Sequence, residues 1–335
     1  MPYPGLVAGI AIAAGLIACL GTRVLIPLLR RAAVLDQPNQ RSLHLRPVPR
    51  GGGIAPVAAI ALAWIALVAT GLVGPSVLFV LVGAMLLAAV SWLDDLGDLP
   101  PATRLFAQAA AVIGGMVVEV PAGPIFQGWL PVELDVVAAA LLWVWFVNLF
   151  NFMDGIDGLA GSEAAAIGIG LFLLAGFGAR QDPAVAALAV VIALAALGFL
   201  VWNWAPARIF LGDAGSVPLG YLLGFLLIDM AAHGRWKPAL ILPLYFLADA
   251  TITLLRRLAR GERVWEAHRQ HFYQRAVQRG LGHGAVTARV IGANLLLIGC
   301  AWAAENGAGL YAAAAAVGIV SVLLASLAWG GAKPR

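Results

Sequence analysis

Residues 184–202 read AVAALAVVIALAALGFLVW, a run that contains no charged side chain. About 18 or more consecutive apolar residues are long enough to cross the hydrocarbon core of a bilayer as one α-helix. The dipeptide Asp182-Pro183 stands directly before the run and is typical of a turn. The stretch therefore predicts a membrane-spanning helix.

Apolar runs of this kind recur along the whole chain. They lie near residues 5–29, 52–70, 75–93, 104–120, 135–150, 163–178, 216–232, 238–256, 288–304 and 308–330. Of the 335 residues, 62% are hydrophobic and only 11% are charged, whereas about 25% of the residues of a soluble domain are charged. No repeat and no separate soluble segment is visible in the sequence. We therefore expect one all-α integral membrane domain, residues 1–335, with about eleven spanning helices.

Lysine and arginine predict the orientation in the membrane. All of the 21 Lys and Arg residues except Arg180, Arg235 and Lys237 fall on one side of the predicted bilayer. Basic residues favour the cytoplasmic side, so the N-terminus is predicted outside and the C-terminus inside. Because no basic residue precedes Arg23, the first run lacks the start of a signal peptide, and we expect it to be retained. The predicted cytoplasmic loops are about 30–51, 94–104, 151–162, 203–215 and 257–287.

Acidic residues gather in the same predicted loops, beginning with Asp94 and Asp95 at the end of the third run. Carboxylates near a membrane interface are costly unless they are paired or bind a cation. Adjacent carboxylates also repel each other, so a cation or a proton is expected nearby. The pair indicates metal binding or proton abstraction, or else only the solvated start of a loop.

A second motif, residues 148–159, reads NLFNFMDGIDGL. Its polar side chains recur every three residues, at Asn148, Asn151, Asp154 and Asp157. In a helix this spacing would place them along one stripe. Oxygen donors in a stripe suit Mg²⁺, whereas a simple helix cap would need only one of them.

A third motif, residues 203–216, reads NWAPARIFLGDAGS. Arg208 could pair with a phosphate, and Phe210 could stack on a nucleobase. Asp213 stands between glycines just before an apolar run. The alternative is a turn in which Asp213 merely caps the next helix.

The remaining polar segments are basic or rich in glycine. Residues 256–289 contain many arginines, and attraction to anionic lipid would explain them. It explains His268 and His271 less well, because imidazole carries little charge at neutral pH. Residues 51–53, a Gly-Gly-Gly turn before a predicted helix, could cradle a phosphate with backbone N–H groups.

Acids for Mg²⁺, arginines for phosphates, an aromatic ring for a base and a membrane location together indicate phosphoryl transfer at a lipid interface. Two alternatives remain open. A transporter could use Asp229 and Asp249, which lie inside predicted spans, although transporters often show repeats and binding sites at the bilayer midplane. A hydrolase would use water in place of a lipid phosphate.

The motifs resemble those of the polyprenyl-phosphate N-acetylhexosamine-1-phosphate transferases, which include phospho-N-acetylmuramoyl-pentapeptide transferase. Asp94-Asp95, NFMDGIDGL at 151–159 and FLGDAGS at 210–216 match in order and spacing, and the resemblance spans about 36–283. It implies about ten or eleven spanning helices. It also implies dependence on Mg²⁺, with Mn²⁺ as a substitute, and release of UMP.

The resemblance assigns roles to individual residues. Asp94 and Asp95 match the pair assigned to activation of the lipid phosphate or support of the metal, and we group Asp154 with them as catalytic. The implied metal ligands are Asp213 and Asn151. The implied nucleotide contacts are Asn203, Phe210, Asp157 and Leu159. Arg104 matches a basic phosphate contact of the family, and we group Arg208 with it.

The last loop departs from the pentapeptide transferase, which carries three histidines there. Residues 268–275 read HRQHFYQR, which resembles the branch that starts O-antigen synthesis from UDP-N-acetylglucosamine or a 6-deoxy relative. His268, His271 and Arg275 are therefore predicted to contact the diphosphate and sugar of the donor. The expected partners are a UDP-N-acetylhexosamine, undecaprenyl phosphate and membrane lipid, without nucleic acid. The expected location is the bacterial inner membrane, where the chain could form a homodimer.

Overall fold

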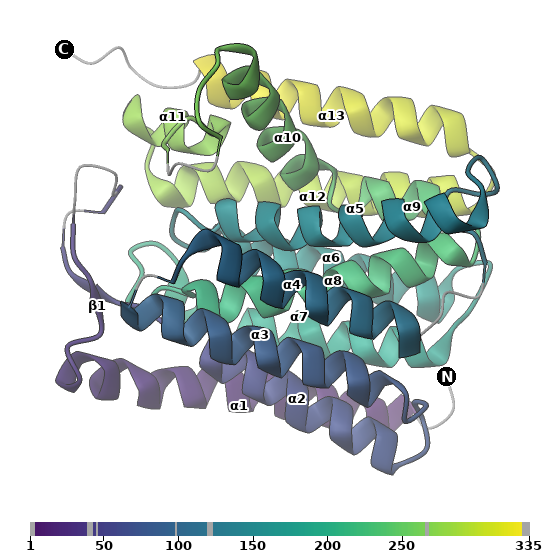
Figure 1. Ribbon diagram of the computed structural model, residues 1–335, viewed down its shortest axis with the longest axis horizontal. Helices are drawn as coiled ribbons and strands as arrows, with labels where there is room; N and C mark the ends of the chain where they lie inside the picture. Colours follow the sequence, from purple (N-terminus) through teal and green to yellow (C-terminus); the bar gives the residue numbers. More distant parts are fainter. Residues whose placement is uncertain are drawn as a thin grey trace.

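The computed structural model describes residues 4–38, 43–44, 46–97, 99–118, 123–264 and 268–329. Its long helices lie side by side as a bundle (Figure 1), which confirms the all-α expectation. The helices are α1 (Pro4–Arg31), α2 (Ile54–Ala69), α3 (Val77–Gly97), α4 (Pro101–Val118), α5 (Val132–Phe152), α6 (Leu159–Phe177), α7 (Pro183–Asn203), α8 (Asp213–Ala232), α9 (Trp236–Ile241), α10 (Leu244–Ala259), α11 (Phe272–Gln278), α12 (His283–Glu305) and α13 (Gly309–Trp329). Two short strands, β1 (Leu35–Asp36) and β2 (Val48–Pro49), pair antiparallel in the first loop. Parts of the predicted cytoplasmic loops, residues 39–42 and 265–267, lie outside the described residues.

Nine of the described helices are long and apolar enough to cross a membrane. The predicted run 52–70 forms α2, which is shorter, with 16 residues. The predicted run 238–256 is divided into α9 and α10 at Leu242-Pro243. Proline lacks an N–H group and disfavours helical backbone at the preceding residue, so it separates the two helices. The predicted total of eleven spans, and the orientation, stay predictions.

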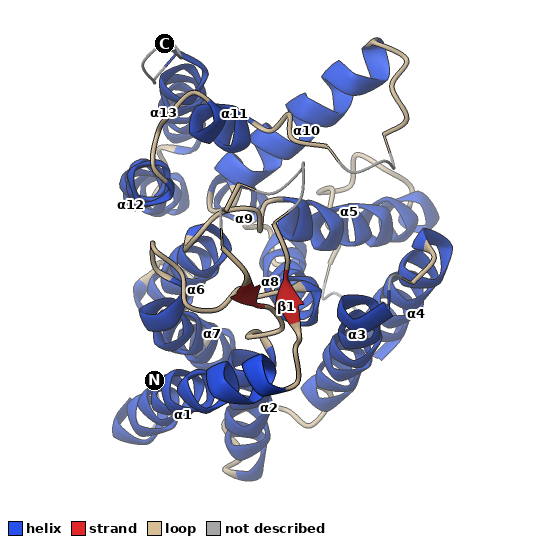
Figure 2. Cartoon of the chain, turned by 90° about the vertical axis from the view of Figure 1, so that its left-hand side faces the viewer, coloured by secondary structure: helices blue, strands red, loops and turns tan. Residues whose placement is uncertain are grey.

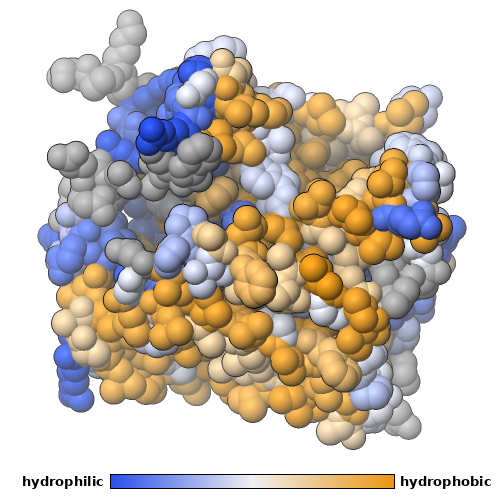
Figure 3. Space-filling model, viewed as in Figure 1, coloured by the Kyte–Doolittle hydropathy of each residue, from blue (hydrophilic) through white to orange (hydrophobic). Residues whose placement is uncertain are grey.

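The outer surface of the bundle is apolar. Hydrophobic residues cover most of the face seen in Figure 3, and hydrophilic residues gather at its two ends. Large apolar side chains are strongly exposed, among them Phe106 at 76% and Leu310 at 79%. Contact with lipid explains this exposure, which would be unfavourable in water. In Figure 1, α1 begins at one end of the bundle and α13 finishes at the opposite end.

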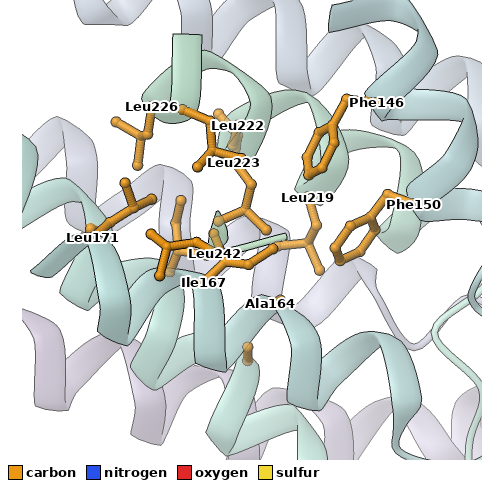
Figure 4. Packing of buried hydrophobic residues seen from close by; sticks show 14 of the residues in the cluster. Phe146, Phe150, Ala164, Ile167, Leu171, Leu219, Leu222, Leu223, Leu226 and Leu242 are labelled. Atoms are coloured by element: carbon orange, nitrogen blue, oxygen red, sulfur yellow. The ribbon is translucent and has the colours of Figure 1, made fainter. Parts of the chain in front are cut away.

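Two helices, α6 and α8, form the centre of the bundle. In their spanning windows 78% and 89% of the residues are buried. Figure 4 shows leucines of α8 packed near Ile167 and Leu171 of α6 and near Phe146 and Phe150 of α5. Small residues allow other helices to approach closely: a Cβ atom on Gly198 of α7 would lie 2.1 Å from the carbonyl oxygen of Gly15 in α1. This packing holds the polar end of α8 in place.

Candidate active site

A cleft of about 270 Å³ opens at the end of the bundle that carries β1 and β2, the end that faces the viewer in Figure 2. It lies on the side predicted to be cytoplasmic. The lining residues are Asp36, Leu43, His44, Arg50, Asp95, Asp154, Gly155, Ile156, Asp157, Asn203, Phe210, Gly212, Asp213, Gln274 and His283. The cleft thus joins segments that are far apart in the sequence, including all three acidic motifs.

The glycine turn of the first loop packs against the third motif. The N–H groups of Gly52 and Gly53 donate to the carbonyl oxygens of Phe210 and Leu211 at 2.9 and 2.8 Å. A Cβ atom on Gly53 would lie only 2.1 Å from the Cα atom of Gly215. The prediction that this turn cradles a phosphate is therefore wrong for these two N–H groups. The missing side chains instead allow two backbone segments to touch.

Asp94 and Asp95 have different partners. The Asp95 carboxylate accepts hydrogen bonds from the N–H groups of Ala214 at 3.1 Å and Asp213 at 3.4 Å, the first residues of α8. The Asp94 carboxylate accepts from the N–H of Leu99 at 2.6 Å and from the guanidinium of Arg104 at 2.9 Å. Asp95 therefore caps α8 from a neighbouring helix, whereas Asp94 anchors the start of α4.

Asp213 shares Arg104 with Asp94. The Nη1 atom of Arg104 lies 2.9 Å from Asp94 Oδ2 and 3.8 Å from Asp213 Oδ2, and the Asp213 side chain is 31% exposed. One guanidinium therefore faces two carboxylates, while Asp95 and Asp154 line the cleft beside them. Carboxyl groups are in excess at this point, which favours a bound cation or a proton on one of them.

The oxygen donors of the cleft suit a half-open cation site. Within the described residues, no three His, Cys, Asp or Glu side chains form a group that could hold a metal by themselves. Mg²⁺ is commonly held by one or two carboxylates and completes its shell with water and substrate phosphates. Asp213 offers such a carboxylate. The Asn151 Oδ1 atom accepts a hydrogen bond from Ser216 Oγ at 2.7 Å, one turn into the same helix α8.

Asp154 lies in the loop after α5 and lines the cleft. Burial, followed by the negative charges of Asp213, Asp95 and Asp157, raises its pKa from 3.8 to about 8. A carboxyl group with a pKa near the working pH can both take up and release a proton. The predicted polar stripe does not extend to this residue, because α5 ends at Phe152.

Of the predicted nucleotide contacts, Phe210, Asp157 and Asn203 line the cleft, and the last two also hold loops through hydrogen bonds. Phe210 lines the cleft, and its ring centroid lies 4.9 Å from that of His44 in an edge-on arrangement. Asp157 accepts from the N–H of Ala207 at 3.0 Å and lies 3.1 Å from His283 Nδ1. These contacts fix the loop that presents Phe210.

Asn203 is buried and bonded at both ends of its amide. Its Oδ1 atom accepts from the N–H of Gly158 at 3.0 Å, and its Nδ2 atom donates to the carbonyl oxygen of Ile209 at 2.9 Å. Leu159 begins α6 with its side chain fully buried, and it does not line the cleft. The nucleotide-binding roles of these two residues stay predictions, and the structure shows them joining the second and third motifs.

Comparison of the sequence with known proteins identifies the family of this chain. The family model described as glycosyl transferase family 4 matches residues 77–231. The decaprenyl-phosphate N-acetylglucosaminephosphotransferase of Mycolicibacterium smegmatis is 30% identical over 289 residues, which are 76% of this chain and 71% of the relative. The chain belongs to glycosyl transferase family 4.

Other relatives place the chain among membrane transferases of this family. The probable undecaprenyl-phosphate N-acetylglucosaminyl 1-phosphate transferase of Bacillus subtilis is 26% identical over 292 residues, which are 81% of this chain and 78% of the relative. The phospho-N-acetylmuramoyl-pentapeptide-transferase of Thermosynechococcus vestitus is 32% identical over 265 residues, with coverages of 71% and 67%. The family resemblance seen in the sequence is thus confirmed, and the protein is a multi-pass membrane transferase.

The histidine loop of this family 4 transferase is arranged differently from our expectation. His271 is only 2% exposed, and its Nδ1 atom lies 3.1 Å from the carboxylate of Asp249. Asp249 is fully buried and also accepts from the N–H of Phe272 at 3.0 Å, so it holds the start of α11. His268 lies beside His271 with ring centroids 4.9 Å apart. Burial, followed by the charges of His271 and Arg257, lowers the pKa of His268 to about 4.

The sugar and phosphate contacts predicted for this loop stay predictions. None of His268, His271 and Arg275 lines the cleft, whereas Gln274 from the same motif does. Arg275 is exposed at the surface. Partial desolvation, followed by repulsion from neighbouring arginines, lowers its pKa. Since Asp249 binds the histidine loop, it also differs from the intramembrane ion ligand that a transporter would require.

Arg208 also lies outside the cleft. Its guanidinium carbon is 5.4 Å from the centroid of the Trp202 ring, and it lines a separate cavity with Arg23 and Arg30. Its predicted contact with the donor phosphate stays a prediction. Arg104, the other predicted phosphate contact, lies beside Asp213 as described above.

Several residues that line the cleft carry no role in the sequence analysis. His283 begins α12, close to Asp157, and no motif surrounds it. His44 and Arg50 belong to the first loop, and only their position shortly before the glycine turn could have indicated that they line the cleft. Gln274 lies inside the histidine motif, so the segment was identified although the individual residue was not.

Proposed function

We propose that this transferase moves an N-acetylhexosamine 1-phosphate from a UDP-sugar to undecaprenyl phosphate and releases UMP. The observation that carries the proposal is the cleft, where Asp95, Asp154 and Asp213 meet Phe210 at one end of a lipid-facing bundle. Names of relatives support the same reaction, because several denote polyprenyl-phosphate N-acetylglucosamine-phosphate transferases. We infer UDP-N-acetylglucosamine, or a 6-deoxy relative, as the donor.

The product would start a cell-surface polysaccharide such as O-antigen at the bacterial inner membrane. In this proposal the soluble nucleotide sugar would enter the cleft from the aqueous side, and the prenyl phosphate from the bilayer around the bundle. The exposed apolar side chains around the bundle are compatible with the second route. We assign the end with β1 and β2 to the cytoplasm because UDP-sugars are cytoplasmic metabolites and because basic residues favour that side.

The donor would lie with its uracil on Phe210 and its diphosphate toward Asp213. Phe210 and Asp213 are three residues apart and line the same cleft. Aromatic stacking contributes about 1–3 kcal/mol per base. The contacts of Asp157 and Asn203 with the loop 204–210 would position the ring before the donor arrives.

Asp213 and Asn151 would hold a Mg²⁺ ion, for which Mn²⁺ can substitute. Asp94 and Asp213 share Arg104, and Asp95 and Asp154 line the same cleft, which fits a divalent cation. When bound, the ion offsets negative charge that builds on the diphosphate and the leaving UMP. Asp94 keeps Arg104 next to Asp213, so the guanidinium can act on the same phosphates.

The transfer itself is a displacement at phosphorus. An oxygen of the prenyl phosphate forms a bond to the β-phosphorus of the donor. The bond from that phosphorus to the α–β bridging oxygen breaks, and UMP departs with the electron pair. Asp154, with its pKa near 8, would accept the proton if the prenyl phosphate arrives protonated. A covalent aspartyl intermediate remains the alternative route.

The test is an assay of the purified full-length protein in detergent with Mg²⁺, undecaprenyl phosphate and a panel of UDP-sugars. We expect UMP and a prenyl diphosphate sugar in equal amounts, with UDP-N-acetylglucosamine among the best donors. UMP release without the lipid would show a hydrolase instead. Failure of every UDP-sugar would refute the proposed reaction, whereas preference for another UDP-sugar would refute only the donor assignment.

A matched pair of variants tests the cation site. Asp213→Asn should lower turnover by about a hundredfold or more, the scale for losing one electrostatic contact to a transition state. Asp182→Asn is the control, because Asp182 caps α7 at the other end of the bundle and asparagine caps equally well. Near-normal turnover of Asp213→Asn would rule out the assignment of this residue to the metal.

A further inference from the structure

Three arginines from two distant segments line one cavity outside the active-site cleft. Arg23 and Arg30 belong to α1, and Arg208 follows α7. The cavity has a volume of about 490 Å³, and Ile26 and Trp202 complete its lining. None of these residues lines the active-site cleft. The cavity is therefore a separate site.

The three guanidinium groups have no acidic partner among the described residues. Like charges that face one cavity repel each other, and an anion placed between them would remove that repulsion. Arginine presents several N–H donors in a planar fork that matches phosphate oxygens. The cavity therefore has the chemistry of a phosphate site.

Contacts of Trp202 hold this cavity together. Its Nε1 atom donates to the carbonyl oxygen of Cys19 in α1 at 2.9 Å, which ties the end of α7 to α1. The guanidinium of Arg208 lies over the Trp202 ring, with Cζ 5.4 Å from its centroid. The N–H of Arg208 also donates to the carbonyl oxygen of Trp202 at 2.9 Å. Arg208 is thus positioned on the side of α1 rather than toward the cleft.

A second, mostly apolar cavity adjoins the first and shares Trp202 and Arg208 with it. Its volume is about 370 Å³, and Val201, Trp204 and Pro206 are among its lining residues. Val201 is 63% exposed and Trp204 is 41% exposed, at the end of a membrane-spanning helix. An apolar surface next to a cluster of arginines matches a molecule with a phosphate at one end and a hydrocarbon chain at the other.

We propose that Arg23, Arg30 and Arg208 bind the phosphate of an anionic phospholipid, whose acyl chain lies over Trp202 and Trp204. The site is independent of the transfer reaction. The site should prefer anionic over zwitterionic phospholipids, because a zwitterionic headgroup would bring a further cation into a cavity that already contains three guanidinium groups. Membrane attraction at a basic surface contributes about fivefold in affinity per arginine.

The test uses the full-length protein in detergent and counts bound lipid by native mass spectrometry. Phosphatidylglycerol and phosphatidylcholine with identical acyl chains are titrated separately. We expect the double variant Arg23→Gln/Arg30→Gln to bind phosphatidylglycerol about 25-fold more weakly, and Arg208→Gln about fivefold more weakly. The control is Arg31→Gln, which removes an exposed arginine that follows Arg30 on α1 but does not line the cavity. Binding to this control should match that of the unchanged protein.

The outcomes separate the sources of the phosphate. An equal loss in the Arg31→Gln control and in the single variant Arg23→Gln would show general surface attraction and overturn the proposal. So would equally tight binding of phosphatidylcholine, or displacement of phosphatidylglycerol by an equal concentration of inorganic phosphate. If only undecaprenyl phosphate shows the dependence on Arg23 and Arg30, the site takes the acceptor and the phospholipid assignment is wrong. Thermal unfolding confirms that the variants are folded, and the single variant Arg23→Gln, with an expected fivefold loss, serves if the double variant is not.

Discussion

Replacement of Asp95 separates the structural contribution of this carboxylate from any direct chemical one. The side chain is 5% exposed, and both of its oxygen atoms accept N–H groups at the start of α8. Alanine removes both acceptors and the charge. Asparagine retains one acceptor oxygen and loses the other together with the charge, so the two variants differ in the cap while both lack a carboxylate.

The cap determines the expected loss of stability. Loss of a side-chain cap costs about 0.5–2 kcal/mol, and each buried N–H group left without an acceptor costs about 1–3 kcal/mol. Asp95→Ala leaves two N–H groups without an acceptor and should therefore lower the free energy of unfolding by about 2–4 kcal/mol, whereas Asp95→Asn keeps one acceptor and should lower it by about 1 kcal/mol. At about 2 °C per kcal/mol in a chain of this size, Tm should fall by about 4–8 °C and about 2 °C.

The assay combines thermal unfolding in detergent, followed by tryptophan fluorescence, with release of UMP. Asp94→Ala is the matched control. Its carboxylate binds the N–H of Leu99 and the partly exposed Arg104, so its removal should cost only about 1 kcal/mol. In the capping interpretation, Asp95→Asn keeps more activity than Asp95→Ala, because Asp213 stays in position.

The opposite pattern would refute this reasoning. If Asp95→Ala unfolds at the temperature of the unchanged protein, Asp95 does not support α8. If Asp95→Asn is as inactive as Asp95→Ala while both remain stable, the carboxylate acts directly on a substrate or a cation. That result would support the catalytic role that the Asp94-Asp95 pair predicts for Asp95.

Three further changes test other parts of the site. The pKa of Asp154 is about 8 in the folded protein and 3.8 in the unfolded chain, so its protonated form stabilises the fold fully below about pH 4, and this stabilisation is lost as the pH rises to about 8. Between pH 6 and pH 9, Tm should therefore fall less for Asp154→Asn than for the unchanged protein. An identical fall would contradict the raised pKa. Phe210→Ala should weaken donor binding by about 1–3 kcal/mol, measured by calorimetry, and unchanged affinity would place uracil elsewhere. Asp249→Asn should lower Tm and reduce kcat/KM without changing the ranking of UDP-sugars, since the loop of His271 lies outside the cleft; a changed ranking would return that loop to the donor site.

The fold could be predicted well from the sequence because lipid imposes simple rules. Each spanning helix satisfies its own backbone hydrogen bonds, so an uninterrupted apolar run such as 184–202 has few other structures available. The same rule is weaker where a run contains proline. Pro243 divides the run 238–256 into α9 and α10, and the apolar composition concealed this break.

The segments of the site could also be predicted, because charged side chains at a membrane are costly and therefore informative. The partners of each side chain could not. Asp249 and His271 are separated by 21 residues, and the contact between their side chains depends on how α10 and α11 pack. Likewise, Arg208 stands two residues before Phe210 in the sequence, but its side chain contacts Trp202 instead of the cleft. Spacing identifies a polar segment, whereas contact directions follow from tertiary packing.

The N-terminus of α8 explains why motifs from distant segments belong to one site. Asp95 of α3 caps it, Asn151 of α5 accepts from Ser216 in its first turn, and Gly53 packs against Gly215. The start of a helix carries about half a positive elementary charge, which lowers the cost of gathering carboxylates and anionic phosphates there. Of the long described helices, α8 has the most buried spanning window. Because α8 is buried along most of its length, it presents Asp213 to the cleft from a well-packed support.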